Sequence, residues 1–162
     1  MSKRRQHALI AAVVVTAALG TGASSVDGRA VLSQQATEPA HVAITGTDYA
    51  FVQPPSMVDP GPTLFSFDNR GSKRHEMSIA LLKPGVTTEV LTRRVDRMAL
   101  TARAVSDSLI GLLVARPGER SGGQLYANLI SGRSYVVICT LKDTPDAAPH
   151  VDLGMIATLH VR

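Results

Sequence analysis

Four side chains with the chemistry of soft-metal ligands are spread along this chain. Cys139 is the only cysteine, and it follows the apolar segment 135–138. His150 and Met155 come after it, and His75 precedes it. Two imidazoles and a thiolate in a plane, with a weak axial thioether, suit both Cu(I) and Cu(II), as rapid electron transfer requires. The four residue types therefore indicate a site for one copper ion.

Each of the four residues also has a simpler interpretation. A lone cysteine such as Cys139 is commonly a buried apolar thiol, and Met155 alone would be read as core packing. A loop histidine such as His150 is by default solvated, and His75 follows the basic pair Lys73-Arg74. Their joint order along the chain favours the metal site over four separate coincidences.

Enzymatic chemistry is not indicated. The chain contains no His-x-His pair, which a multinuclear copper oxidase would need. Nothing near Cys139 in the sequence marks a catalytic base, and its apolar flank raises the pKa of the thiol. The other histidines, His7, His41 and His160, fall in the N-terminal segment or on the polar faces of predicted strands. We therefore predict that the protein is not an enzyme.

The N-terminus predicts export. Lys3, Arg4 and Arg5 precede an apolar stretch over 8–19, and small residues at 21–23 form a cleavage site, so residues 1–23 are read as a signal peptide. Twelve helical residues span about 18 Å, too short for a membrane core of roughly 30 Å. We expect a periplasmic or secreted protein without stable membrane insertion after cleavage. An exported chain with one thiol cannot form an intramolecular disulfide.

Charge and length limit the classes of partner. The net charge of +4 includes three basic residues of the signal, so the mature chain carries only +1 and no nucleic acid partner is indicated. The polar, aperiodic segment 24–38 predicts a flexible leader. Residues 39–162 are long enough for one domain with a single core, which we expect to be monomeric.

Short alternating segments dominate that domain. Strands are predicted around 41–45, 63–69, 75–82 and 157–162, and segments 125–130 and 135–139 are read as a hairpin. Residues 106–123 are read as a short apolar run and a Gly/Pro-rich loop. One helix is predicted over 87–105 from an apolar stripe of Leu91, Val95, Met98, Ala102 and Val105. The pattern predicts an all-β fold, an antiparallel β-sandwich with one inserted α-helix.

The spacing of the candidate ligands resembles that of the cupredoxins, the plastocyanin- and azurin-like blue type 1 copper proteins. The similar motifs are Asn69-x-Gly71-x-x-x-His75, Tyr135-x-x-x-Cys139 and His150-x-x-x-x-Met155. The resemblance covers roughly residues 40–162. It implies a Greek-key sandwich holding one type 1 copper, with His75, Cys139 and His150 as equatorial ligands and Met155 as the axial one.

The chain departs from the family pattern at two places. Ten residues separate Cys139 from His150, whereas most small blue copper proteins have two to four, and exported bacterial members are similar in having a longer loop. Loop-closure entropy grows slowly with length, so the spacing is compatible with the site, and Asp143, Pro145 and Asp146 are expected to order the loop. Glu76 stands where plastocyanins have Asn or Asp, which alters the hydrogen bonding around the ligands.

Three functions are compatible with these observations. The leading hypothesis is an exported one-electron carrier that passes electrons to an unidentified redox partner protein through an exposed edge of His150. An apolar patch of Pro149, Val151 and Leu153 would then dock the partner. Copper delivery or buffering is the second hypothesis, and a loose, exposed ligand loop would favour it. The third is a metal-free cupredoxin-like interaction module.

Overall fold

The computed structural model of the chain describes residues 38–86, 90–91 and 106–162. The predicted signal peptide, nearly all of the predicted leader and most of the predicted helix lie outside the described residues. Of that helix only Val90 and Leu91 are described, and Leu91 is buried in an apolar cluster. Within the described part of the chain, no helix is long and apolar enough to cross a membrane.

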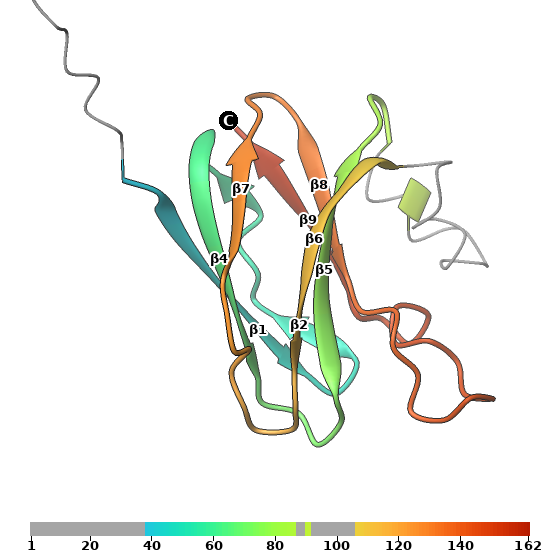
Figure 1. The fold of residues 1–162 in the computed structure, drawn as a ribbon. Helices are drawn as coiled ribbons and strands as arrows, with labels where there is room; N and C mark the ends of the chain where they lie inside the picture. The colour runs from blue at the N-terminus through green and yellow to red at the C-terminus, as the bar shows by residue number, and fades with distance from the viewer. Residues whose placement is uncertain (1–37, 87–89, 92–105) are drawn as a thin grey trace, which may run out of the picture. The chain divides into compact units, whose positions relative to one another are not determined.

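The described residues form nine strands in two sheets (Figure 1). The first sheet has the order β2-β1-β4-β7 and consists of β1 (Ala40–Thr47), β2 (Ala50–Val52), β4 (Gly61–Asn69) and β7 (Leu125–Leu129). The second has the order β3-β9-β8-β5-β6 and consists of β3 (Met57–Val58), β5 (His75–Leu82), β6 (Ser106–Ala115), β8 (Ser134–Ile138) and β9 (Ile156–Val161).

The predicted β-sandwich is confirmed, and its sheets are mixed. Most neighbouring strands are antiparallel, but β1 pairs with β4 in parallel and β3 pairs with β9 in parallel. A parallel pair cannot be joined by a tight turn, so each of these connections must cross to other strands first.

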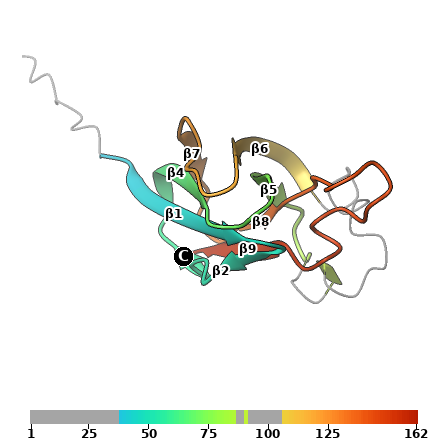
Figure 2. The ribbon, with the colours of Figure 1, turned by 90° about the horizontal axis from the view of Figure 1, so that it is seen from below.

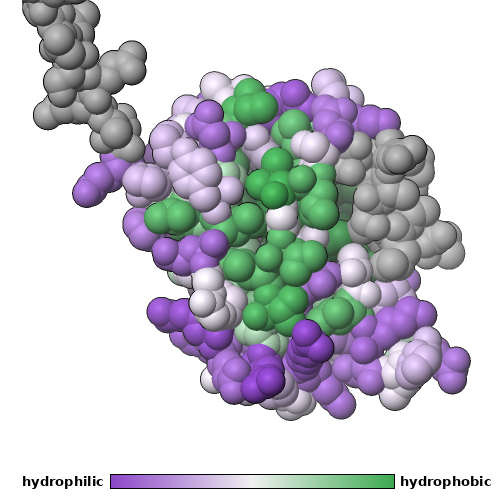
Figure 3. All heavy atoms as spheres, viewed as in Figure 1, coloured by the Kyte–Doolittle hydropathy of each residue, from purple (hydrophilic) through white to green (hydrophobic). Residues whose placement is uncertain are grey.

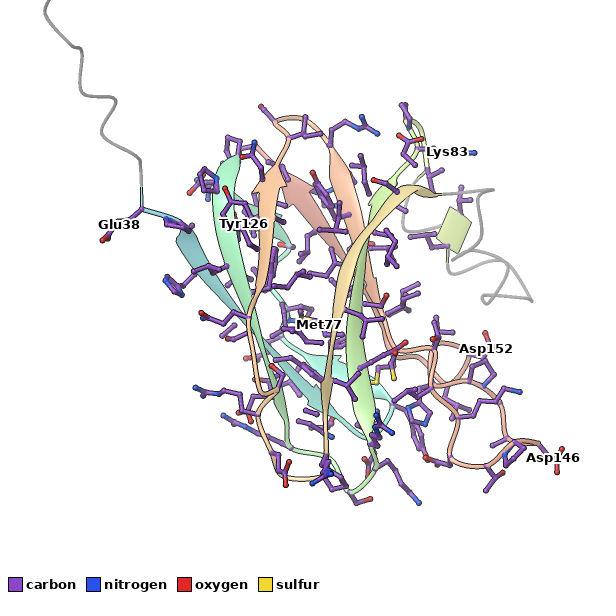
Figure 4. The ribbon with its side chains drawn as sticks, in the orientation of Figure 1. Glu38, Met77, Lys83, Tyr126, Asp146 and Asp152 are labelled. Atoms are coloured by element: carbon purple, nitrogen blue, oxygen red, sulfur yellow. The ribbon has the colours of Figure 1, made fainter. Side chains whose placement is uncertain are left out.

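Alternating side chains from the two sheets meet in one apolar core. Phe65 and Phe67 lie on the same face of β4, as their spacing predicts, and both are fully buried. They pack in one cluster with Met77 and Val137 of the second sheet. Figure 4 shows Met77 between the two sheets. Each such side chain stabilises the fold by about 1.5–3 kcal/mol through its burial.

Two predictions about the strands are wrong. Segments 125–130 and 135–139 do not form a hairpin, because β7 pairs with β4 whereas β8 pairs with β5 and β9 in the other sheet. The segment read as an apolar run and loop contains β6, a ten-residue strand at the edge of the second sheet. Figure 3 shows apolar surface over β6 and β7, to which Leu109 and Leu112 contribute exposed side chains.

One end of the sandwich gathers the segments that carry the candidate ligands. β5 begins there at His75, and β8 ends there just before Cys139. The long β8–β9 connection leaves the sheet at this end and extends to one side of the sandwich (Figure 2). The antiparallel pairing of β5 with β8 thus places residues far apart in sequence next to one another.

Candidate metal centre

His75 is positioned by a loop that Asn69 organises. The buried Asn69 amide nitrogen donates to the carbonyls of Lys73, Ala115 and Arg116, and its oxygen accepts from Gly71 N–H at 2.9 Å. These bonds tie the β4–β5 loop to the end of β6. His75 follows directly as the first residue of β5, and its side chain is fully buried.

Cys139 follows β8 and points into the same end of the core. Its sulfur accepts a hydrogen bond from the backbone N–H of Glu76 at 3.3 Å, which links it to the residue next to His75. Burial raises the pKa of the Cys139 thiol to about 11. A bound cation opposes this effect, because it stabilises the thiolate.

His150 and Met155 lie in the connection after Cys139, which is held by its own backbone hydrogen bonds. His150 N–H donates to the Leu141 carbonyl at 2.8 Å, and Met155 N–H donates to the His150 carbonyl at 3.0 Å. Cys139 N–H in turn donates to the Met155 carbonyl at 3.2 Å. Gly154, just before Met155, has a φ of 117°, a conformation that other residues rarely adopt. Both ligand candidates are buried.

Three of the four predicted ligands converge. The Nδ1 atoms of His75 and His150 lie 3.0 Å apart, and the Cys139 sulfur lies 3.9 Å and 3.3 Å from them. The potential ligand atoms of these three residues are all within 4.8 Å of one another, which is a grouping that can hold a metal ion. Two imidazole nitrogens and one thiolate are ligands that copper and zinc both accept.

The outer nitrogen of each imidazole meets an aspartate. His75 Nε2 lies 3.1 Å from Asp48 Oδ1, and His150 Nε2 lies 3.2 Å from Asp143 Oδ1. Burial lowers the pKa of His75, although its hydrogen bond to Asp48 opposes the shift. In a metal-bound site, a carboxylate that accepts the Nε2 proton leaves Nδ1 of each ring to bind the metal.

Both aspartates are themselves held by hydrogen bonds. Asp48 accepts from the hydroxyl and N–H of Ser72 and from Lys73 N–H, and the Ser72 hydroxyl is the largest cause of its strongly lowered pKa. Asp143 accepts from the Tyr49 hydroxyl at 2.5 Å, which lowers the pKa of Asp143 and raises that of Tyr49. Both carboxylates therefore stay anionic at neutral pH.

Sequence reasoning assigned no role to Asp48 or Tyr49, which occupy the turn between β1 and β2. The Tyr49 ring packs edge-to-face on His150, with 5.1 Å between ring centroids. Tyr49 has a φ of 64°, a strained backbone conformation for a bulky residue. No pattern in the sequence reveals these contacts, because Asp48 and Tyr49 bond to partners 24 to 94 residues away.

Asp143 was predicted to order the loop between Cys139 and His150, and its contacts with His150 and Tyr49 agree with that role. Asp146 instead lies exposed in the loop, away from the sandwich (Figure 4). Glu76 takes part in the hydrogen bonding around the ligands: its Oε1 accepts from the Thr140 N–H at 2.9 Å and from the Thr140 hydroxyl at 2.6 Å. This side chain thereby fixes the residue that follows Cys139.

The predicted exposed edge of His150 is wrong. His150 is only 1% exposed, because Asp143 and Tyr49 cover its outer edge. Pro149 and Val151 are also buried, so the predicted apolar docking patch does not form. Only Leu153 of that patch is exposed. Asp143 of the long loop thus covers the imidazole of His150, where the sequence predicted a surface for a partner.

No protein-family model and no curated protein matches the chain. Solved structures with a similar fold include the dithionite-reduced auracyanin of Roseiflexus castenholzii, at 18% identity and a TM-score of 0.50, covering 76% of this chain and 97% of that one. Auracyanin B matches at 18% identity and a TM-score of 0.50, covering 76% and 88% of the two chains. Auracyanin A of Chloroflexus aurantiacus, described as a "blue" copper protein, matches at 20% identity and a TM-score of 0.50, covering 76% and 99%.

The three auracyanins share the fold of this chain over 76% of its length. The buried His–Cys–His cluster fits a type 1 copper site. The described domain therefore has the cupredoxin fold.

Proposed function

We propose that this protein binds one copper ion and carries single electrons. The observation that carries the proposal is that His75, Cys139 and His150 converge in a buried site. These three residues are enough to supply the three ligands of a trigonal copper site. These three residues would be the equatorial ligands and Met155 the weak axial one. The bound copper would supply the one-electron redox change, and the protein would hold the ligand atoms in place.

Burial of the ligands favours electron transfer over copper delivery. Each of the four candidates is at most 1% exposed, and the imidazoles are additionally covered by Asp48, Asp143 and Tyr49. Delivery requires an incoming ligand to reach the metal, whereas an electron needs only a short path through packed atoms. A closed site with fixed ligands therefore suits a carrier better than a donor of copper.

The half-buried Tyr49 offers a route between the site and a partner. Its ring contacts His150 on one side, and its hydroxyl reaches the exposed Asp143 on the other. A redox partner protein would dock over this turn, in place of the apolar patch predicted from the sequence. We further propose that the mature chain is exported, to the periplasm or out of the cell, as its N-terminal segment indicates, and that it is a monomer.

The test is to add Cu(II) to the purified chain and to record the visible spectrum. An intense thiolate-to-copper band that disappears reversibly on one-electron reduction is expected, and Cys139→Ser should abolish it. His160→Ala, a surface histidine outside the site, serves as the matched control and should keep the band. A colourless protein that retains zinc but not copper would contradict the proposal, and so would a band that survives Cys139→Ser.

A further inference from the structure

The same arrangement occurs at both imidazoles of the site. In each, Nδ1 faces the Cys139 sulfur and the other ring, and Nε2 lies 3.1–3.2 Å from an aspartate oxygen. The aspartates come from separate segments, Asp48 from the β1–β2 turn and Asp143 from the β8–β9 connection. Two independent parts of the chain thus supply one anionic acceptor for each ring.

Each aspartate has its own support, so it does not depend on the imidazole alone. Ser72 donates both its hydroxyl and its N–H to Asp48. Tyr49 donates its hydroxyl to Asp143, and Lys73 lies 4.0 Å from the same carboxylate. The two carboxylates are therefore fixed in position and keep their negative charge beside the site.

We propose that Asp48 and Asp143 are positioning residues that together stabilise the oxidised state of copper bound to His75, Cys139 and His150. The proposal rests on the proposed function. Reduction of Cu(II) to Cu(I) adds one electron and lowers the charge of the site by one, so a nearby anion disfavours it. A carboxylate that accepts the imidazole N–H also makes the ring a stronger donor, which favours the higher charge on the metal.

The experiment compares Asp48→Asn, Asp143→Asn and the double variant in the full copper-loaded chain. Asparagine keeps an oxygen that accepts the Nε2 proton but removes the charge. The midpoint potential is measured in a redox titration monitored through the visible band. Each single variant should raise the midpoint potential, and the double variant should raise it further. The expected size is about a tenfold change per charge in the Cu(I):Cu(II) ratio at fixed ambient potential, or about 59 mV for one electron.

A matched control removes a carboxylate that is far from the imidazoles. Asp59 is exposed and pairs with Arg162, and Asp59→Asn should leave the potential unchanged. Affinities add a second readout, measured by competition with EDTA for Cu(II) and with bicinchoninate for Cu(I). The Cu(II) affinity should fall in the Asp48 and Asp143 variants, while the Cu(I) affinity stays the same or rises.

The outcomes separate this inference from the proposed function. A wild-type chain that forms no thiolate-to-copper band would contradict the function before any variant is measured. If the variants show the wild-type band but their potentials match that of Asp59→Asn, the positioning role is contradicted while the function stands. Equal losses of Cu(I) and Cu(II) affinity would indicate structural support only, and would also overturn the inference.

Discussion

The two halves of the proposed site are held in different ways. His75 and Cys139 lie at the ends of β5 and β8, two central strands whose backbones pair with one another. His150 lies within the long β8–β9 connection, which is held by turn hydrogen bonds and by the Tyr49–Asp143–His150 contacts, and Met155 ends this connection, where its carbonyl accepts from Cys139 N–H. Ladder hydrogen bonds form and break cooperatively, whereas single turn contacts can open alone.

The difference teaches how a long ligand loop is compatible with a fixed metal site. The sheet supplies one imidazole and the thiol in a fixed place. The loop then needs only to bring its own ligands to that place, and its extra residues, Asp143 among them, hold them there. We therefore expect that changes under the sheet-borne half alter metal binding strongly, and that changes in the loop contacts act more mildly.

Gly71→Ala is expected to have the largest effect, because it breaks the support of the sheet-borne half. A Cβ atom at Gly71 would collide with the Asp48 carboxylate and lie 3.0 Å from Asp48 N and 3.1 Å from His75 Nε2. The Asp48–His75 pair must then move apart. Loss of such a partner typically lowers metal affinity by about 10- to 100-fold, which competition with a chelator would measure.

Gly122→Ala is the control, because a Cβ there meets no atom within 4 Å and its backbone is not in the left-handed region. An equal loss of affinity in both alanine variants would show that loop glycines matter for flexibility rather than for the packing of the Asp48–His75 pair.

Because Cys139 would bind the metal as a thiolate, we expect the metal affinity to depend on pH. The pKa of Cys139 is about 11 in the folded, metal-free protein, so the thiol carries its proton at neutral pH and must lose it on binding. Metal affinity should therefore rise about tenfold per pH unit between about pH 7 and 9, where the buried His75 is already neutral. Competition titrations across this range would measure the slope, and a flat profile would mean that the thiol is not a ligand.

Asn69→Ala tests the loop that delivers His75 to the site. The variant leaves the buried backbone carbonyl of Ala115 and the partly buried one of Arg116 without the amide donor, and it should destabilise the fold by about 1–3 kcal/mol. Urea unfolding of the metal-free chain would measure the loss. Asn128→Ala, on an exposed position of β7, should change stability little, and a comparable loss there would remove the special role of Asn69.

Tyr49→Phe acts on the loop-borne half and should have the smallest effect. The variant keeps the ring on His150 but removes the hydrogen bond to Asp143, which is partly exposed and worth about 0.5–1.5 kcal/mol. Hydrogen exchange at His150 N–H, which bonds the Leu141 carbonyl, should accelerate a few-fold. Tyr126→Phe, an exposed tyrosine of β7, should leave it unchanged. A larger effect of Tyr49→Phe than of Gly71→Ala would reverse the ranking of the two halves.

The sequence predicts the parts of the molecule that have local signals. Alternation of Phe65 and Phe67 marks β4, and the order His75, Cys139, His150 and Met155 suggests one site. The structure brings the first three together and buries the fourth at the same end. The role of Met155 as the axial ligand stays a prediction.

What sequence reasoning missed depends on contacts without a period. β6 does not show the two-residue alternation of a strand, because its pairing with β5 shifts register between Ile79 and Ala80. Leu109 and Leu112 are both exposed although they are three residues apart. The β7–β8 connection looks like a hairpin in sequence, yet it crosses between the sheets. Asp48 and Tyr49 act only through partners that the fold brings to them.

X-ray absorption at the copper edge tests the central claim most directly, namely that the protein holds one preformed trigonal site. We expect one short sulfur neighbour, from Cys139, and two nitrogen neighbours in both the Cu(II) and the Cu(I) forms of the full chain, with little change in these distances between the two forms. In Cys139→Ser the sulfur neighbour should be lost. Copper surrounded by nitrogen and oxygen alone in the wild-type chain, or a ligand set that changes on reduction, would contradict the account.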